Sequence, residues 1–304
     1  MTAWAYATLK RADHEALFEA LRRVSIPTIH RFKPQELNNL AWAFATLLSH
    51  DGELFAAISC AALAQIDDFN PQDLAITALS FARVEICDAA LMAAISKAEV
   101  GMMHQLQPQE LGNSLWAFGK LMILDVPLMY AVSQEAQRKM SHFSPQNLTN
   151  SLWSFAKVVV LDNPLVEAVS TASLAILPQF NAQNLSNTVW SFTTLAITPM
   201  PCLDALAKAF LTSLQASAAA EPPSPQAVAN LAWALTTLGY LHRPLLEGIA
   251  AHVLTTLAQY AGAFGVSLGL VLLGPELSEA TLAGGHGCTG AGALWRVSSW
   301  AALV

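Results

Sequence analysis

Polar and cationic residues recur at fixed distances after a repeated Pro-Gln dipeptide, whose first residue is taken below as position zero. Position twelve carries a cation in three successive repeats, at Arg83, Lys120 and Lys157. Position five carries asparagine in five of the six repeats, at Asn39, Asn113, Asn150, Asn187 and Asn230. Cationic groups can contact phosphates, and side-chain amides can hydrogen-bond the edges of unpaired bases. These residue types therefore suit a surface that binds a single-stranded nucleic acid.

The dipeptide itself marks a repeat of about 37 residues. Position zero falls at Pro34, Pro71, Pro108, Pro145, Ala182 and Pro225. Every copy has Leu or Val at position three, Trp or Leu at position eight, and Phe or Leu at position ten. Self-similarity at a fixed period of this length is typical of helical repeat arrays.

Each repeat contains two predicted helices. Ser144 and Ser224 are favourable N-caps before a proline at the first helical position, and capping explains the acids Glu36, Asp73 and Glu110 at the capping-box position. A second stretch of helical apolar periodicity follows in every repeat, as in residues 53–66. Stacked helix pairs bury a continuous core. We therefore predict an all-α fold, a right-handed α-solenoid of two-helix repeats of about 37 residues.

The array is predicted to span residues 1–260, and residues 261–304 to form a glycine-rich tail that is disordered or loosely packed. The sequence from Trp4 to Leu9 matches that from Trp42 to Leu47, so the chain begins inside a repeat. We interpret this as a fragment of a longer protein or a late start codon. The stretch ASAAAEPPSP, residues 216–225, delays the last repeat and is typical of a surface loop.

Composition limits the partners. The chain is 54% hydrophobic and 12% charged, with a mean hydropathy of +0.42. Polar residues interrupt the apolar runs before residue 258, and the run from Tyr260 to Gly274 is short and contains four glycines, so no membrane partner is predicted. A net charge of −7 weighs against a polyanionic ligand, because affinity for phosphates depends on Lys and Arg.

The sequence shows no catalytic or metal-binding pattern. The sequence contains no GxSxG, GxGxxG, P-loop or HExxH motif. Its four cysteines form no CxxC pair, and its eight histidines show no metal-ligand spacing. We predict a protein that is not an enzyme, with no catalytic residue, no metal, no cofactor and no small-molecule substrate.

At its Trp, Phe and Pro-Gln positions, as in PQNLTNSLWSFAK from Pro145 to Lys157, the sequence resembles two families. These are the octotricopeptide repeats of algal organelle proteins and the leucine-rich region of FAST-kinase-related mitochondrial proteins. The resemblance covers about residues 1–260 and implies an RNA-binding solenoid that helps to process, stabilise or translate transcripts in a mitochondrion or chloroplast. It also implies organellar ribonucleoproteins as possible partners. Members often end in a RAP domain, which nothing in the tail matches.

A helical wheel predicts which face would bind. Positions five, nine and twelve fall together, opposite the apolar arc of positions three, ten and eleven. The predicted RNA site comprises the asparagines and cations above together with the other polar residues at position twelve, Thr46, Thr194 and Thr237. Small residues at position nine would leave a groove between them. Two interpretations of the asparagines stay open, since an amide repeated in register could instead hydrogen-bond the neighbouring helix. The position-eight tryptophans are predicted to pack in the core.

The leading hypothesis is a non-catalytic protein that holds single-stranded RNA along the polar face of its first helices. The alternative is a protein-binding α-solenoid scaffold, because such arrays offer long concave surfaces to peptides as readily.

Overall fold

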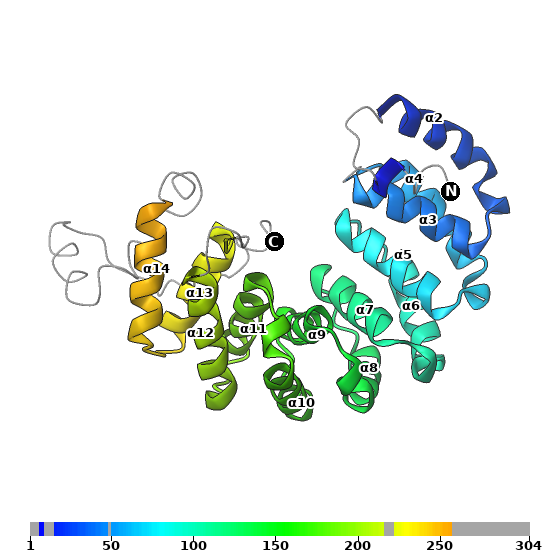
Figure 1. The fold of residues 1–304 in the computed structure, drawn as a ribbon. Helices are drawn as coiled ribbons and strands as arrows, with labels where there is room; N and C mark the ends of the chain where they lie inside the picture. The colour runs from blue at the N-terminus through cyan, green and yellow to red at the C-terminus, as the bar shows by residue number, and fades with distance from the viewer. Residues whose placement is uncertain (1–5, 9–14, 48–49, 216–221, 257–304) are drawn as a thin grey trace, which may run out of the picture.

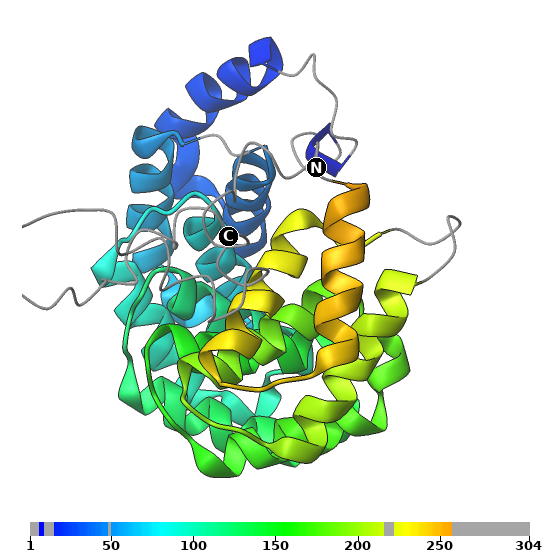
Figure 2. The same ribbon diagram turned by 90° about the vertical axis from the view of Figure 1, so that its left-hand side faces the viewer.

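The computed structural model describes residues 6–8, 15–47, 50–215 and 222–256. These residues form helices and turns and contain no strand. The helices stack in chain order into an open arch (Figure 1), and in the perpendicular view of Figure 2 the middle repeats again lie at the bottom with both ends rising from them. The predicted all-α solenoid of two-helix repeats is confirmed.

Each repeat supplies one helix to each of two stacks. The first helices are α3 (Pro34–Thr46), α5 (Pro71–Arg83), α7 (Pro108–Lys120), α9 (Pro145–Lys157), α11 (Ala182–Thr194) and α13 (Pro225–Thr237). The second helices are α4 (Gly52–Leu63), α6 (Ala89–Gly101), α8 (Val126–Lys139), α10 (Asn163–Ala175), α12 (Met200–Gln215) and α14 (Arg243–Thr255). Helix α2 (Glu15–Ser25) precedes them, and short 3-10 turns lead into α3, α5, α7, α9 and α11.

Side-chain caps define where the helices begin. Asn181 accepts a hydrogen bond from the backbone N–H of Asn184 at 2.8 Å, and the side chain of Asn184 accepts one in return from the N–H of Asn181. The carboxylate of Glu36 likewise accepts from the N–H of Lys33 at 2.9 Å, which is the capping role predicted for it. Four second helices begin at an aspartate whose carboxylate accepts from the backbone N–H three residues later, and these are Asp51, Asp88, Asp125 and Asp162.

The core lies between the two stacks. First helices contact first helices and second helices contact second helices along the whole described array. In the middle of the arch α7, α9 and α11 lie on the inner side and α8, α10 and α12 on the outer side (Figure 1). The position-ten residues point between the stacks and are fully buried, and they are Phe44, Phe81, Phe118, Phe155, Phe192 and Leu235.

Small residues bring the first helices close together. A Cβ atom added to Gly119, at position eleven of α7, would lie 2.9 Å from the Cα atom of Ser154, at position nine of α9. The same pair of positions meets again where the Thr193 hydroxyl donates to the backbone oxygen of Ala234 at 3.3 Å. Position eleven of one repeat therefore packs against position nine of the next.

This contact corrects the predicted groove of small residues. Position nine is buried in every repeat, at Ala43, Ser80, Ala117, Ser154, Ser191 and Ala234. A wheel for one isolated helix could not show this, because each first helix is flanked by two others and buries a second, narrower stripe against its predecessor. The small residues set the helix spacing and do not line a groove.

The boundary at residue 260 and the glycine-rich tail lie outside the described residues, as does the part of the predicted loop at 216–221. Over the part of the chain that the structure describes, no helix is both long and apolar enough to cross a membrane.

One acid is buried in the array. Glu99 of α6 is fully buried, and its Oε1 atom accepts a hydrogen bond from the Ser114 hydroxyl at 2.5 Å. Its Oε2 atom has no hydrogen-bond partner among the described residues. Burial, opposed by the Ser114 hydrogen bond and reinforced by the charges of Glu110 and Asp125, raises the pKa of Glu99 to about 8. The carboxyl group is therefore protonated in the folded protein over most of the physiological range.

We expect Gly119→Ala to destabilise the array although alanine favours helix. The propensity gain is at most about 1 kcal/mol, whereas the added Cβ meets backbone of the next helix, and overpacking of this kind costs about 1–3 kcal/mol. Urea denaturation should show a lower free energy of unfolding. Gly101→Ala is the control, because a Cβ there has nothing within 4 Å, and its stability should be unchanged or higher. Equal effects of the two changes would contradict the close-packing argument.

Stability should fall as pH rises between the unfolded and folded pKa values of Glu99. A pKa raised from 4.5 to about 8 means that the folded state holds the proton more tightly than the unfolded state. This contribution is complete below pH 4.5, is lost progressively up to about pH 8, and amounts to up to a few kcal/mol. Glu99→Gln cannot ionise, so its urea midpoints should be flatter across that interval. An identical pH profile in both proteins would show that Glu99 titrates normally.

Candidate nucleic-acid interface

The stacking leaves one face of every first helix on the inner surface of the arch. Positions two and nine face the preceding first helix, positions four and eleven face the next, and positions three and ten face the second helices. Positions six and seven are buried in every repeat. Positions one, five, eight and twelve remain, and at about 100° per residue they fall within an arc of about 60°. Four rows of side chains therefore run along the inner surface, one from each position.

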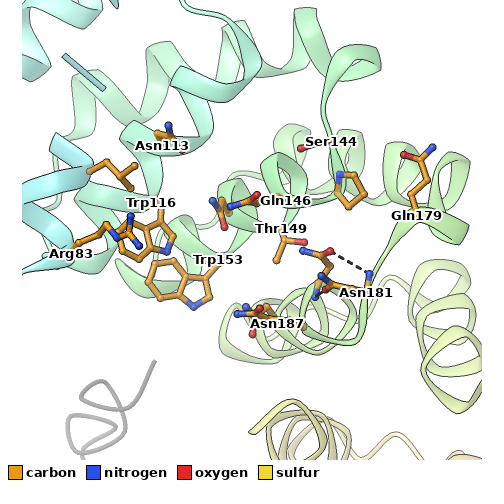
Figure 3. Close-up of a pocket in the computed structure, with 15 residues that line it drawn as sticks. Arg83, Asn113, Trp116, Ser144, Gln146, Thr149, Trp153, Gln179, Asn181 and Asn187 are labelled. Carbon is orange, nitrogen blue, oxygen red and sulfur yellow. Dashed lines mark hydrogen bonds between the residues drawn. The ribbon is translucent and has the colours of Figure 1, made fainter. Parts of the chain in front are cut away.

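A cavity of about 670 Å³ opens on this surface across four repeats. It is lined by rows from α5, α7, α9 and α11 and by the N-terminal ends of α9 and α11 (Figure 3). From the predicted site it brings together Arg83, Asn113, Asn150 and Asn187. Trp116 and Trp153 line its wall beside them. The remaining predicted residues do not line this cavity.

The position-five asparagines keep their side-chain amides available. Asn113, Asn150 and Asn187 are half-buried, as are Asn39 and Asn230 at the same position towards the ends of the array. Among the described residues, none of these five side-chain amides makes a hydrogen bond to a neighbouring repeat. The inter-repeat bond comes from position four instead, where the amide of Asn38 donates to the carboxylate of Asp73. The structure therefore gives no support to the interpretation of position five as a stacking contact.

The three cations at position twelve differ in their surroundings. Arg83 is exposed and lines the cavity. Lys120 forms an ion pair with Glu85 of the preceding repeat, with 2.9 Å between Nζ and Oε1, and its side chain is only 10% exposed. The hydrogen bond and charge of Lys120 lower the pKa of Glu85. Lys120 is thus held by a carboxylate, which the sequence pattern did not indicate.

Lys157 lies over an aromatic ring. Its Nζ atom is 5.5 Å from the centre of the Trp153 ring, the geometry of a cation–π contact. Burial, and to a smaller extent the charge of Lys120, lower the pKa of Lys157. No carboxylate among the described residues lies within ion-pair distance of Lys157 or Arg83. Neither cation is therefore neutralised by an ion pair.

The threonines at position twelve turn inward onto their own helices. The hydroxyls of Thr194 and Thr237 donate to the backbone oxygens of Trp190 and Trp233 at 3.0 and 2.9 Å. The hydroxyl of Thr46 is buried without a hydrogen-bond partner among the described residues. Each bound hydroxyl retains its oxygen as an acceptor but has no proton to donate.

The tryptophans at position eight belong to the inner surface as well as to the core. Trp153 is 5% exposed, whereas Trp233 is 41% exposed, so the prediction of core packing is wrong for Trp233. The rings of Trp116 and Trp153 stack with centroids 6.3 Å apart at an interplanar angle of 19°. The helical wheel already indicated that the tryptophans lie near the inner surface, because position eight is about 40° from position twelve.

A row of glutamines at position one escaped the sequence prediction. It comprises Gln35, Gln72, Gln109, Gln146, Gln183 and Gln226, and all but Gln226 are exposed. Gln146 and Gln183 line the cavity. The signal was the presence of glutamine at the same offset in all six repeats. In the sequence analysis this glutamine was used only to align the repeats.

The cavity combines flat aromatic surface with amide groups that both donate and accept. Aromatic side chains stack on nucleobases at a gain of about 1–3 kcal/mol per base, and amides hydrogen-bond the base edges. No group of three or more His, Cys, Asp or Glu residues that could hold a metal ion is present in the described part of the chain. The arrangement suits recognition of unpaired bases.

Residues 2–265 match the family model described as RNA-editing substrate-binding complex 6 protein. No curated protein matches the chain. The match overturns the resemblance to the octotricopeptide and FAST-kinase-related families. Those families share a helical repeat with apolar and aromatic residues at fixed positions, and such a pattern records how helices stack more than which family they come from.

Trp153→Ala should destabilise the array, because truncating a buried tryptophan typically costs about 3–5 kcal/mol. Trp233→Ala is the matched control at the same repeat position, and at 41% exposure it should cost less than about 1 kcal/mol. Urea denaturation of both variants measures the difference. Equal midpoints for the two variants would contradict the burial assigned to Trp153.

Proposed function

Since the chain belongs to the RNA-editing substrate-binding complex 6 protein family, we propose that it is a non-catalytic component of an RNA-editing complex and holds single-stranded RNA along its inner surface. The family description names an RNA-editing substrate, which is an RNA, and a complex, which implies protein partners. The proposed site consists of the predicted residues on the inner surface together with the tryptophan and glutamine rows.

The observation that carries this proposal is the cavity where amide and indole side chains converge. Asn113, Asn150 and Asn187 reach it from three successive helices, and their amides have no partner among the described residues. The stacked rings of Trp116 and Trp153 lie beside them. Unsatisfied amides next to a flat aromatic wall suit bases that are splayed out of a single strand.

The charge distribution favours contact with bases over contact with phosphates. The chain carries a net charge of −7, and the inner surface offers Arg83 and Lys157 as cations without a carboxylate partner. Affinity that rests on stacking and amide hydrogen bonds depends little on salt, whereas each phosphate contact on a single strand adds about 0.7 to the salt slope. We therefore infer a binding mode of modest salt dependence.

The proposal places this RNA-editing role in a mitochondrion. The organellar prediction included the chloroplast, and the family match gives that alternative no support. Other proteins of the complex are the proposed partners besides RNA.

A filter-binding titration with a single-stranded RNA of about 20 nucleotides tests the inner surface. Asn113→Ala, Asn150→Ala and Asn187→Ala combined should weaken binding by at least about tenfold, because each removes hydrogen bonds to bases and none removes charge. The slope of log affinity against log salt should stay constant. Arg83→Thr with Lys157→Thr should instead make that slope shallower by about 1.4, at about 0.7 per phosphate contact.

Lys97→Thr with Lys208→Thr provides the matched control, since both lysines are exposed on second helices, away from the inner surface. Its net charge changes as much as that of the cation variant, yet its salt slope should remain close to that of the unchanged protein. Undiminished affinity in the asparagine variant together with an unaltered slope in the cation variant would refute RNA binding on this face.

A further inference from the structure

The turns between first and second helices form a second surface with a different chemistry. In two successive repeats these turns expose apolar side chains, namely Met122, Leu124 and Val126 after α7, and Val159 and Leu161 after α9. Their exposed fractions run from 50% for Leu161 to 72% for Val159. Tyr130, one turn along α8 from Val126, is 64% exposed on the same side. We call this set of six side chains the apolar edge.

The turns begin at position fourteen, which has a left-handed backbone in every repeat where the structure describes it. Met122 and Val159 occupy equivalent positions with φ of 58° and 55°, in the left-handed region that disfavours side chains with a Cβ and β-branched ones most. Glu85 and Ala196 have φ of 55° and 54° at the equivalent position, and the last repeat has glycine there, Gly239, with φ of 64°. The left-handed turn is therefore a feature of the repeat, and Met122 and Val159 differ from the others in placing a large, exposed apolar side chain at it.

Charge and hydrogen bonding limit what the edge can bind. Asp125 and Asp162 lie in these two turns and cap α8 and α10 through one carboxylate oxygen each. The cations immediately before the turns are engaged elsewhere, Lys120 with Glu85 and Lys157 over the Trp153 ring. The N–H groups of Met122 and Val159 already donate to the backbone oxygens of Gly119 and Ala156, both at 3.1 Å. A partner therefore cannot add a β-strand here and must contact side chains. Phosphates and anionic lipids would be repelled.

We propose that the apolar edge is a docking surface for an amphipathic helix of a partner protein, whose apolar stripe is bordered by Lys or Arg. The stripe covers Leu124, Val126 and Val159, and its cations face Asp125 and Asp162. Helix-on-side-chain recognition of this kind uses apolar anchors at helical spacing. None of the six edge residues lines the inner cavity, although Met122 occupies the position next to Lys157 that Glu85 occupies next to Lys120.

Fluorescence anisotropy of the full chain tests the edge with a labelled Leu/Lys amphipathic peptide, and a Leu/Glu peptide of the same pattern serves as its charge-reversed counterpart. Met122→Gly with Val159→Gly removes two apolar contacts and suits the local φ, so the thermal midpoint should be equal or higher. Binding of the Leu/Lys peptide should fall by at least about tenfold, or about 1.4 kcal/mol. The Leu/Glu peptide should bind the unchanged protein at least about tenfold more weakly than the Leu/Lys peptide.

Leu254→Ser is the control, because Leu254 on α14 is 72% exposed and lies away from the edge. It should leave peptide affinity within about twofold, and the glycine variant should keep full RNA affinity, which separates this proposal from the RNA site. Equal peptide binding by the glycine variant and the unchanged protein would overturn the proposal. So would equal affinity for the two peptides, or binding of phosphatidylcholine vesicles that the glycine variant loses, which would mark a lipid contact.

Discussion

The close approach of consecutive first helices is the contact on which the rest of the structure depends. Only a small residue fits where position eleven meets position nine of the next repeat, as Gly119 and Ser154 show. Because the inner helices pack closely through small side chains, the stack can curve towards its inner side. The curvature makes neighbouring inner faces converge, and this brings Arg83 of α5 and Asn187 of α11 to one cavity.

The sequence was sufficient for the fold because the repeat itself carries the packing rules. The offset of each leucine and phenylalanine from the Pro-Gln dipeptide predicted which residues are buried, and Phe118 and Phe155 are buried as expected. The site was only partly predictable. A wheel drawn for one helix separates only a buried side from an exposed side. A first helix in this stack faces the preceding first helix, the next first helix, the second helices and the inner surface. Position nine therefore looked exposed and Trp153 looked purely structural, although Ser154 is buried between helices and Trp153 also lines the cavity.

Equivalent positions in a repeat array do not guarantee equivalent chemistry. Arg83, Lys120 and Lys157 share an offset, yet one is exposed in the cavity, one is bound to Glu85 and one lies over an indole ring. For Lys120 the difference comes from one residue of the preceding repeat, and for Lys157 it comes from a ring of its own helix. Lys120 meets a glutamate at position fourteen, whereas Lys157 has Met122 at the corresponding position. A periodic pattern can thus locate a surface, but only the non-periodic neighbours determine the charge that the surface presents.

The two candidate surfaces differ in polarity and charge. Positions one to twelve belong to helices whose inner rows are polar or aromatic, and position fourteen begins turns whose exposed groups are apolar beside Asp125 and Asp162. An RNA would be repelled by those carboxylates and attracted by Arg83. A basic helix would be attracted by the carboxylates and repelled by Arg83. The two proposals therefore assign the two ligands to different surfaces. A component of an RNA-editing complex could then hold a transcript and a protein neighbour at once without competition between them.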